Sequence, residues 1–449
     1  MKVARRAVSL VVSSAASDVR QEPGCDTSRN YSDRDPYHTT RIFIVIMGMR
    51  LVTCLGVGAI ALLGATQSFA QRGFSLDAEP VPVSTVSDPG RPVFVDLNSS
   101  GGIRRVGVGQ STIALDGGAG AGRFELGGTI VGTSVSKSGR FLAVLVLVDG
   151  AAAQSGGLEL HVLSNDLDLV YRVPLRHGDD EPYPGLSVDG RDGSVAVLWH
   201  AKGSVTFLSP SGARVADIRL TNGLHDIERA ILASRADRSG QIALAVNEPV
   251  TDGVRSVAAR QVRIFSSTGE PVSVFDLPSF ALSSMAMSED GERIGIGAYD
   301  VPSGVYQTTV FDRAGTELYR TDFAAESIEF DAAGTHALVS NKRRVAIVDH
   351  EAARSVMEYR LSDSSARSLS AALSADGRFA VAVVGRTAFD AGRFKYTDMQ
   401  LVEFVRGSEG TFTTKTRPIA GTAETIRADV EEFGVAVSLD ETTLLFRRP

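Results

Sequence analysis

The chain has 449 residues, of which 43% are apolar and 22% charged, and its formal net charge is −7. This composition is typical of a globular protein and excludes a wholly disordered chain. Because nucleic-acid binding needs a basic surface, the negative charge argues against a nucleic-acid partner. The two cysteines, Cys25 and Cys54, lie near the start, so the rest of the sequence offers no disulfide, zinc thiolate or cysteine nucleophile.

The first 70 residues differ in character from the rest. Residues 51–66 are apolar and uncharged, Arg50 precedes them, and the small-residue tract Ser68-Phe69-Ala70 follows. This pattern is typical of a secretory signal peptide. We therefore expect residues 49–70 to be a signal peptide cleaved after Ala70, and the protein to be exported to the periplasm or the extracellular space.

Residues 1–48 are polar and irregular, whereas a signal peptide is expected to begin near its own methionine. We expect translation to start at Met47 or Met49 and residues 1–48 to be a non-native or disordered extension. In the alternative, the extension is real and 42–65 is an anchoring span, although Arg50 would then be costly in the membrane. Since the apolar run is short for a span, we expect no stable membrane insertion after cleavage.

One hairpin signal recurs along the rest of the chain. It consists of two alternating apolar runs around a turn such as Asp-Gly, as in LSADGRFAVAVV at 373–384. Five further clear copies lie at 135–146, 188–199, 235–246, 286–297 and 329–340, with weaker ones at 85–96 and 436–447. The expected positive-φ turn residues are Gly90, Gly139, Gly193, Gly240, Gly291, Gly334 and Gly377.

A second hairpin recurs between the copies of the first, for example at 205–220 and 262–277. Two hairpins in each period of about 40–50 residues predict units of four antiparallel strands, which is the signature of an all-β β-propeller. The alternation has period 2, which excludes the helical repeats of similar length.

We expect seven four-stranded blades within 105–449. Six complete units run from about 130 to 418, and the seventh would join the hairpin at 111–126 to a terminal hairpin at 428–447. The N- and C-terminal strands would then pair and close the ring. Residues 71–104 would lead into the propeller. If residues 81–97 supply an extra partial blade, the number is eight.

The S-x-D-G tracts, such as Ser288-Glu289-Asp290-Gly291 and Ser374-Ala375-Asp376-Gly377, resemble those of the WD40-like β-propeller superfamily in the form common in exported bacterial proteins. The resemblance covers about 105–449 and implies the fold rather than a function. The Trp-Asp and Gly-His dipeptides of WD40 repeats are absent, as is the tryptophan-rich motif of quinoprotein propellers, so we expect no cofactor.

The strand order sorts the connections into two faces. With strands a to d running from the centre outward, the a–b and c–d turns lie on one face, here named the turn face. The b–c loops and the d–a crossovers lie on the other, named the loop face. The Asp-Gly turns serve hairpin geometry on the turn face, so we expect any function on the loop face.

Three b–c loops are long, at 247–260, 298–306 and 386–396. They carry basic and aromatic residues, which are enriched where proteins bind partners. We expect a monomer that binds a protein or cell-envelope component through these loops, with tolerated loop growth as the alternative. The candidate residues are Arg255, Arg260, Tyr299, Tyr306, Arg386, Phe389, Arg393 and Lys395.

Two crossovers, at 177–183 and 222–228, are rich in histidine and carboxylates. If they converge at the channel mouth, they could form the metal or acid–base site of a hydrolase or lactonase. G-x-S-x-G and H-E-x-x-H motifs are absent, so a binding module is favoured over this enzyme alternative and no metal site is assigned. The weak catalytic candidates are His177, Asp179, Asp180, His225 and Asp226.

Overall fold

The computed structural model describes residues 81–83, 91–97, 103–117, 122–148, 157–178, 181–221, 231–249, 257–390, 392–431, 434–440 and 442–447. All of these residues belong to one compact unit of the chain, which begins after residue 50. The expected extension and signal peptide lie outside them. The described residues form strands and turns, and none of them forms a helix that could cross a membrane.

The strands pair in antiparallel order into mostly four-stranded sheets, as the alternating hairpins predict. The first sheet contains β2 (Arg91–Leu97), β3 (Ile103–Val108), β4 (Thr112–Gly117) and β5 (Gly122–Glu125). The second contains β6 (Gly128–Val135), β7 (Phe141–Val148), β8 (Gly157–Ser164) and β9 (Leu169–Leu175). The third contains β10 (Gly185–Val188), β11 (Val195–Trp199), β12 (Ser204–Leu208) and β13 (Arg214–Arg219).

The next sheet is larger, because one long strand belongs to two units. It contains β14 (Ile231–Arg235), β15 (Ile242–Val246), β16 (Glu248–Pro249), β17 (Val257–Phe265), β18 (Pro271–Met287), β19 (Arg293–Asp300), β20 (Val305–Asp312) and β21 (Glu317–Thr321). The N-terminal part of β18 pairs with β17, and its C-terminal part, from Phe280 onward, pairs with β19. An outer strand thus continues directly into the inner strand of the next unit.

Three four-stranded sheets complete the arrangement. One contains β22 (Ser327–Phe330), β23 (His336–Ser340), β24 (Arg344–Asp349) and β25 (Arg354–Arg360). The next contains β26 (Ala366–Leu373), β27 (Phe379–Asp390), β28 (Arg393–Arg406) and β29 (Phe412–Pro418). The last contains β30 (Arg427–Glu431), β31 (Gly434–Ser438), β32 (Thr443–Arg447) and β1 (Val81–Val83).

The pairing corrects the expected seven-unit scheme. The hairpin at 111–126 does not share a sheet with the terminal hairpin, because residues 91–108 already supply its partner strands, β2 and β3. The terminal sheet instead takes its fourth strand from β1, with Val81 opposite Leu445. With β18 divided between two units, the described strands correspond to the alternative of eight four-stranded units.

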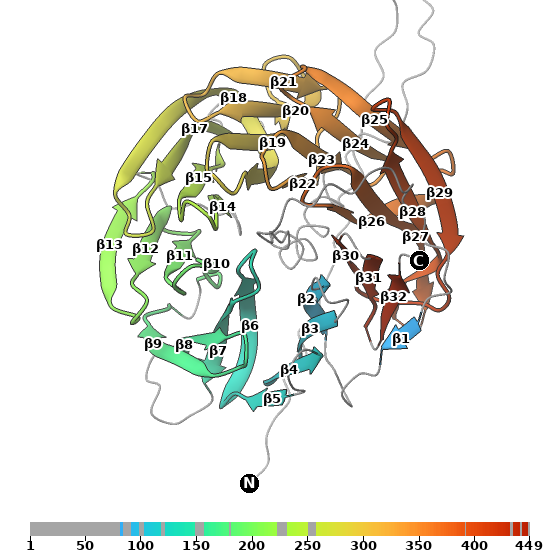
Figure 1. The fold of residues 1–449 in the computed structure, drawn as a ribbon. Helices are drawn as coiled ribbons and strands as arrows, with labels where there is room; N and C mark the ends of the chain where they lie inside the picture. Colours follow the sequence, from blue (N-terminus) through green and yellow to red (C-terminus); the bar gives the residue numbers. More distant parts are fainter. Residues whose placement is uncertain are drawn as a thin grey trace, which may run out of the picture. The chain divides into compact units, whose positions relative to one another are not determined.

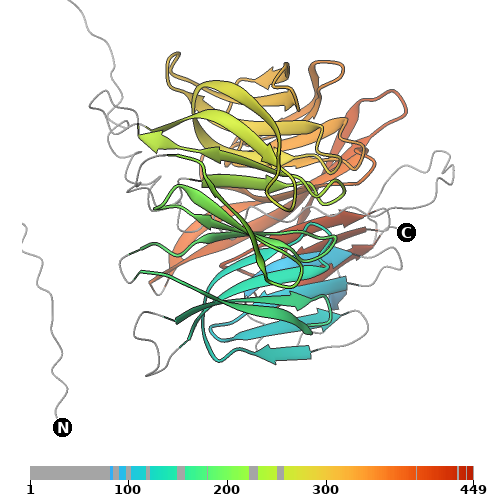
Figure 2. The ribbon, with the colours of Figure 1, turned by 90° about the vertical axis from the view of Figure 1, so that its left-hand side faces the viewer.

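The sheets lie side by side around a common centre, with β2, β6, β10, β14, β22, β26 and β30 innermost (Figure 1), and Figure 2 shows the same sheets from the side. Apolar side chains of neighbouring sheets pack together, as Leu145 and Leu160 do with Val195 and Val197. The first and last sheets share a smaller cluster of Val95, Ala436 and Leu445. Each sheet therefore buries both faces, which a single four-stranded sheet cannot do.

The recurring turns have the predicted backbone geometry. The described a–b turn glycines have positive φ, between 65° and 80°, a conformation that glycine adopts without a Cβ clash. At Gly377 the nearest contact for an added Cβ would be Asp331 Oδ2 at 2.8 Å. Glycine is thus required at this turn both for its φ and for the space beside it.

Candidate functional site

The expected catalytic cluster is described only in part. Asp179, Asp180, His225 and Asp226 lie outside the described residues, so their convergence stays a prediction. His177 is 9% exposed and stacks on Tyr183, with ring centroids 5.1 Å apart. Where the structure describes the chain, no three His, Cys, Asp or Glu side chains form a group that could hold a metal.

The crossover that carries His177 is tied to the neighbouring b–c turn. Lys202 Nζ lies 2.9 Å from Glu181 Oε2, and the same ammonium lies 4.7 Å from the centroid of the Trp199 ring. The hydrogen bond from Lys202 lowers the pKa of Glu181. The ion pair with Lys202 thus accounts for part of the polarity of this crossover.

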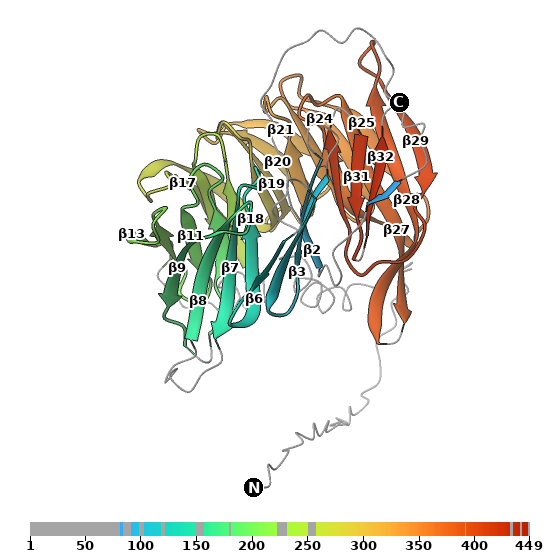
Figure 3. The same ribbon diagram turned by 60° about the horizontal axis from the view of Figure 1, so that its bottom comes forward.

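Four of the predicted partner residues form two aromatic pairs on the loop face. Tyr299 lies opposite Tyr306 in the β19–β20 hairpin, with ring centroids 4.9 Å apart. Phe389 lies opposite Phe394 near the end of the β27–β28 hairpin, also at 4.9 Å. The second hairpin extends beyond its neighbours (Figure 3). The b–c connections expected as loops at 298–306 and 386–396 are therefore strand extensions that present paired rings.

Three of these four rings are open to solvent, whereas Tyr299 is partly buried. Phe389 is 66% exposed, Phe394 65% and Tyr306 59%. The remaining exposed aromatic side chain in the described part of the chain is Tyr183, at 41%, in a d–a crossover. All four therefore belong to loop-face connections, whereas the exposed valines Val215 and Val274 lie on outer strands.

The predicted basic residues are more dispersed. Arg386 lies 2.7 Å from Asp363 and 3.5 Å from Asp398, and Arg393 lies 3.3 Å from Glu424. Hydrogen bonds from Ser365 and then from Arg386 hold the pKa of Asp363 well below its usual value. These exposed ion pairs orient the guanidinium groups beside the aromatic hairpin. Lys395 lies in the same hairpin and is partly buried.

Arg260 lies on β17. It lines an open hollow of about 480 Å³ between β17 and its neighbours, whose other lining residues include Leu220, Leu244, Glu248 and Asp276. Arg255 lies outside the described residues. That the candidate partner residues form one binding surface stays a prediction.

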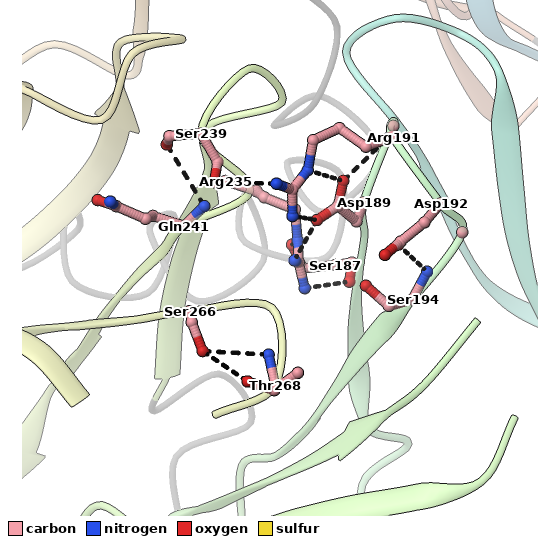
Figure 4. Close-up of polar contacts among 12 residues, drawn as sticks. Ser187, Asp189, Arg191, Asp192, Ser194, Arg235, Ser239, Gln241, Ser266 and Thr268 are labelled. Atoms are coloured by element: carbon pink, nitrogen blue, oxygen red, sulfur yellow. Dashed lines mark hydrogen bonds and ion pairs between the residues drawn. The ribbon is translucent and has the colours of Figure 1, made fainter. Parts of the chain in front are cut away.

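The sequence analysis missed a buried ionic network on the turn face, shown in Figure 4. Asp189, which follows β10, has no exposed side-chain surface. Arg235 at the end of β14 reaches it at 3.2 Å and donates to the Ser187 carbonyl at 3.3 Å. Arg191 also contacts Asp189, at 3.0 Å, and donates to the Ser239 carbonyl at 3.1 Å. These bonds link the turns of two neighbouring sheets.

A sequence signal for charge on this face does exist. The second residue of the a–b turn is Ala332 or Ala375 in two units, but Lys137, Asp237 or Glu289 in three others. Charged residues at a position that takes alanine or, at Gly190, glycine in other units indicate a local role beyond hairpin geometry, which the repeat pattern alone does not reveal.

Comparison with known proteins identifies the fold. No family model matches the sequence, and no curated protein matches it. Among solved structures, the chain resembles the β-propeller domain of Cps50 (Swd1) from Myceliophteria thermophila, with a TM-score of 0.44 at 14% identity over 72% of this chain and 98% of that domain. It also resembles the C-terminal WD40 domain of Sif2, with a TM-score of 0.50 at 9% identity over 78% and 92%. The expected WD40-like β-propeller fold is confirmed.

Proposed function

We propose that this WD40-like β-propeller is an exported, non-catalytic binding module whose loop face holds a protein or cell-envelope component. The observation that carries the proposal is that the four exposed aromatic side chains in the described part of the chain belong to loop-face connections. Aromatic residues supply large apolar contacts at little entropic cost and dominate interface energies.

The Phe389–Phe394 pair is the strongest candidate anchor. Its rings are held against each other by the register of β27 and β28, so little side-chain freedom remains to be lost on binding. The ion-paired Arg393 supplies a polar neighbour. A rigid apolar centre with a charged edge is the arrangement typical of binding surfaces.

The test compares two double variants that each remove exposed apolar surface. Phe389→Ser with Phe394→Ser alters the hairpin, whereas Val215→Ser with Val274→Ser alters outer strands and is the matched control. Each protein is immobilised and exposed to a detergent extract of the cell envelope. We expect the unaltered protein and the control to retain the same component in a saturable manner, and the hairpin variant to lose it. Equal retention by all three proteins would exclude the hairpin as the binding site.

Export is tested independently of binding. The N-terminus of the protein recovered from the periplasm and the medium is determined by mass spectrometry. We expect Gln71 as the first residue, because the small-residue tract ends at Ala70. A cytoplasmic protein that retains residues 1–70 would contradict this part of the proposal.

A further inference from the structure

A buried histidine lies where the fifth and sixth units meet. β24 alternates between two neighbours, since Ala346 and Val348 belong to the apolar cluster shared with the fifth unit, and Val345 and Ile347 to the one shared with the seventh. His350 follows the last residue of β24 and continues the row of Ala346 and Val348. It is 2% exposed. An imidazole thus ends the apolar row that joins these two units.

The contacts of the ring agree with this placement. The His350 ring meets Phe330 edge-on, with centroids 6.1 Å apart and planes at 80°. Phe330 ends β22 and belongs to the same apolar cluster. A Cβ added to Gly295 on β19 would lie 3.4 Å from Phe330 Cζ. Phe330 therefore packs between His350 and the fifth unit.

Neither ring nitrogen of His350 has a hydrogen-bond partner among the described residues. Two other buried histidines differ, because His161 Nε2 lies 3.0 Å from Glu159 Oε2, and His336 Nδ1 lies 3.0 Å from Asp331 Oδ2. A protonated imidazole carries two N–H donors and a positive charge. His161 and His336 each have a carboxylate to accept one of these donors, whereas a protonated His350 would be a buried cation without an acceptor, which is strongly unfavourable.

The charged groups nearby do not supply a free counter-charge. The Asp331 carboxylate is already bonded to His336, and Asp349 Oδ1 accepts from the Ala352 N–H at 2.9 Å. Burial, and then the like charge of Arg293, lower the pKa of His350. The charged groups that act on His350 are Arg293 of β19, Asp331 after β22, and Asp349 and the exposed Glu351 beside it in the chain.

The c–d turn that carries His350 is weakly held. Its residues 351–354 are exposed. Ala353 adopts a φ of 49°, which is unfavourable for a residue with a Cβ, and its N–H donates to the His350 carbonyl at a long 3.4 Å. The turn can therefore leave its place while the pairing of β24 with β23 persists.

We propose that this turn is a pH-sensitive switch, in which protonation of His350 drives the imidazole out of the apolar cluster and releases the turn. A solvated histidine takes up a proton near pH 6.5. The closed turn is therefore fully stable above about pH 6.5. It loses stability as the pH falls from that value toward the lower pKa of His350 in the closed state, because only the open state binds the proton in this range.

The test is hydrogen exchange followed by mass spectrometry on the full chain at about pH 7 and about pH 5, with the intrinsic exchange rates corrected for pH. We expect the opening constant of residues 349–354 to rise by about tenfold at the lower pH. His350→Leu should remove this rise, because leucine fits the apolar cluster and cannot be protonated. His161→Leu is the matched control and should leave the rise unchanged, since His161 lies on β8 in another unit.

An equal rise in the unaltered protein and His350→Leu, or the same rise in every c–d turn, would overturn the proposal. A second measurement does not depend on the folding of His350→Leu. In the unaltered protein, the histidine ring signals are titrated by NMR, and the His350 signal is assigned by its loss in His350→Gln. A pKa near 6.5 for His350 would also refute the switch. Neither measurement requires a partner, so the result is independent of loop-face binding.

Discussion

Replacing Arg235 with methionine tests whether the buried ionic network stabilises the junction of two sheets. The Arg235 side chain is 4% exposed, and the Asp189 side chain that it contacts is fully buried. Removal of one partner from a buried ion pair typically costs about 3–5 kcal/mol, because the remaining charge is uncompensated. Here Arg191 still contacts the same carboxylate at 3.0 Å. We therefore expect Arg235→Met to lower the free energy of unfolding by about 2–3 kcal/mol, at or below the low end of that range.

The matched variant is Arg191→Met. Its side chain is 40% exposed, so solvent screens its charge, and we expect a loss of about 1 kcal/mol or less. The double variant deprives Asp189 of both cations. Since a fully buried carboxylate would then lack a counter-charge, the combined loss should exceed the sum of the two single losses.

Urea-induced unfolding measures these differences, followed both by circular dichroism and by the fluorescence of Trp199, which lies on β11 in the affected sheet. Coincidence of the two signals checks that the transition is cooperative. The reasoning is refuted if Arg235→Met is as stable as the unaltered protein, or if the losses in the double variant simply add.

Three further predictions concern turn geometry and pH. Gly377→Ala and Gly392→Ala both place alanine at positive φ, but only at Gly377 would the new Cβ meet a neighbour within 4 Å, so Gly377→Ala should lose about 1–2 kcal/mol more in urea unfolding. Burial raises the pKa of Asp331, but hydrogen bonds from His336 and Thr335 outweigh it and lower the pKa below 3.8. The ionised Asp331 carboxylate therefore stabilises the folded protein above the pKa of the unfolded state, and this stabilisation is lost as the pH falls through the lower pKa of the folded state. Asp331→Asn should thus flatten the fall in melting temperature below about pH 4. Burial raises the pKa of Glu329 in the folded protein well above 4.5. The protonated carboxyl group therefore adds its full stabilisation below pH 4.5, and this stabilisation is lost as the pH rises through the pKa of the folded state. Glu329→Gln should thus raise the melting temperature at pH 7 but not at pH 4, and a lower value at pH 7 would contradict this.

The sequence predicts the strands and turns of this fold well because both depend on local rules. Alternation defines each strand, and a glycine at a fixed place in each a–b turn marks the next hairpin. The aromatic pairs follow the same logic, since Tyr299 and Tyr306 stand at equivalent distances from one turn and must face each other once the hairpin forms.

The number of units was harder to predict because local pattern does not determine which hairpins share a sheet. β18 is the clearest case, since it runs from one unit into the next with no turn to separate them. Pro278, which has no N–H to donate, lies between Asp276, which pairs with β17, and Phe280, which pairs with both β17 and β19. In the structure this proline lies next to the point where β18 changes its pairing partner from β17 to β19. In the sequence alone, a proline at this position indicates the end of a strand.

The hydrogen bonds between the charged turns of different sheets could not be predicted from the repeat, because they depend on the distance between those turns. Lys137 and Met287 are 150 residues apart in sequence and yet share a hydrogen bond. The repeat gives the order of strands within a unit, but it does not tell how far each turn reaches toward the centre. Substitution of alanine by charge at one turn position was the available signal, and it indicates the residues without their partners.

The pairing of β1 with β32 has a consequence for the order of folding. All other described strands find their sheet partners within their own unit or the adjoining one, so those sheets can assemble as the chain emerges during synthesis. The terminal sheet cannot, because Val81 must wait for Leu445 to be made. Until then the nascent protein carries an unpaired N-terminal strand, and closing so long a loop is slow. Chain release from the ribosome, rather than any local hairpin, should therefore set the time at which the last sheet forms.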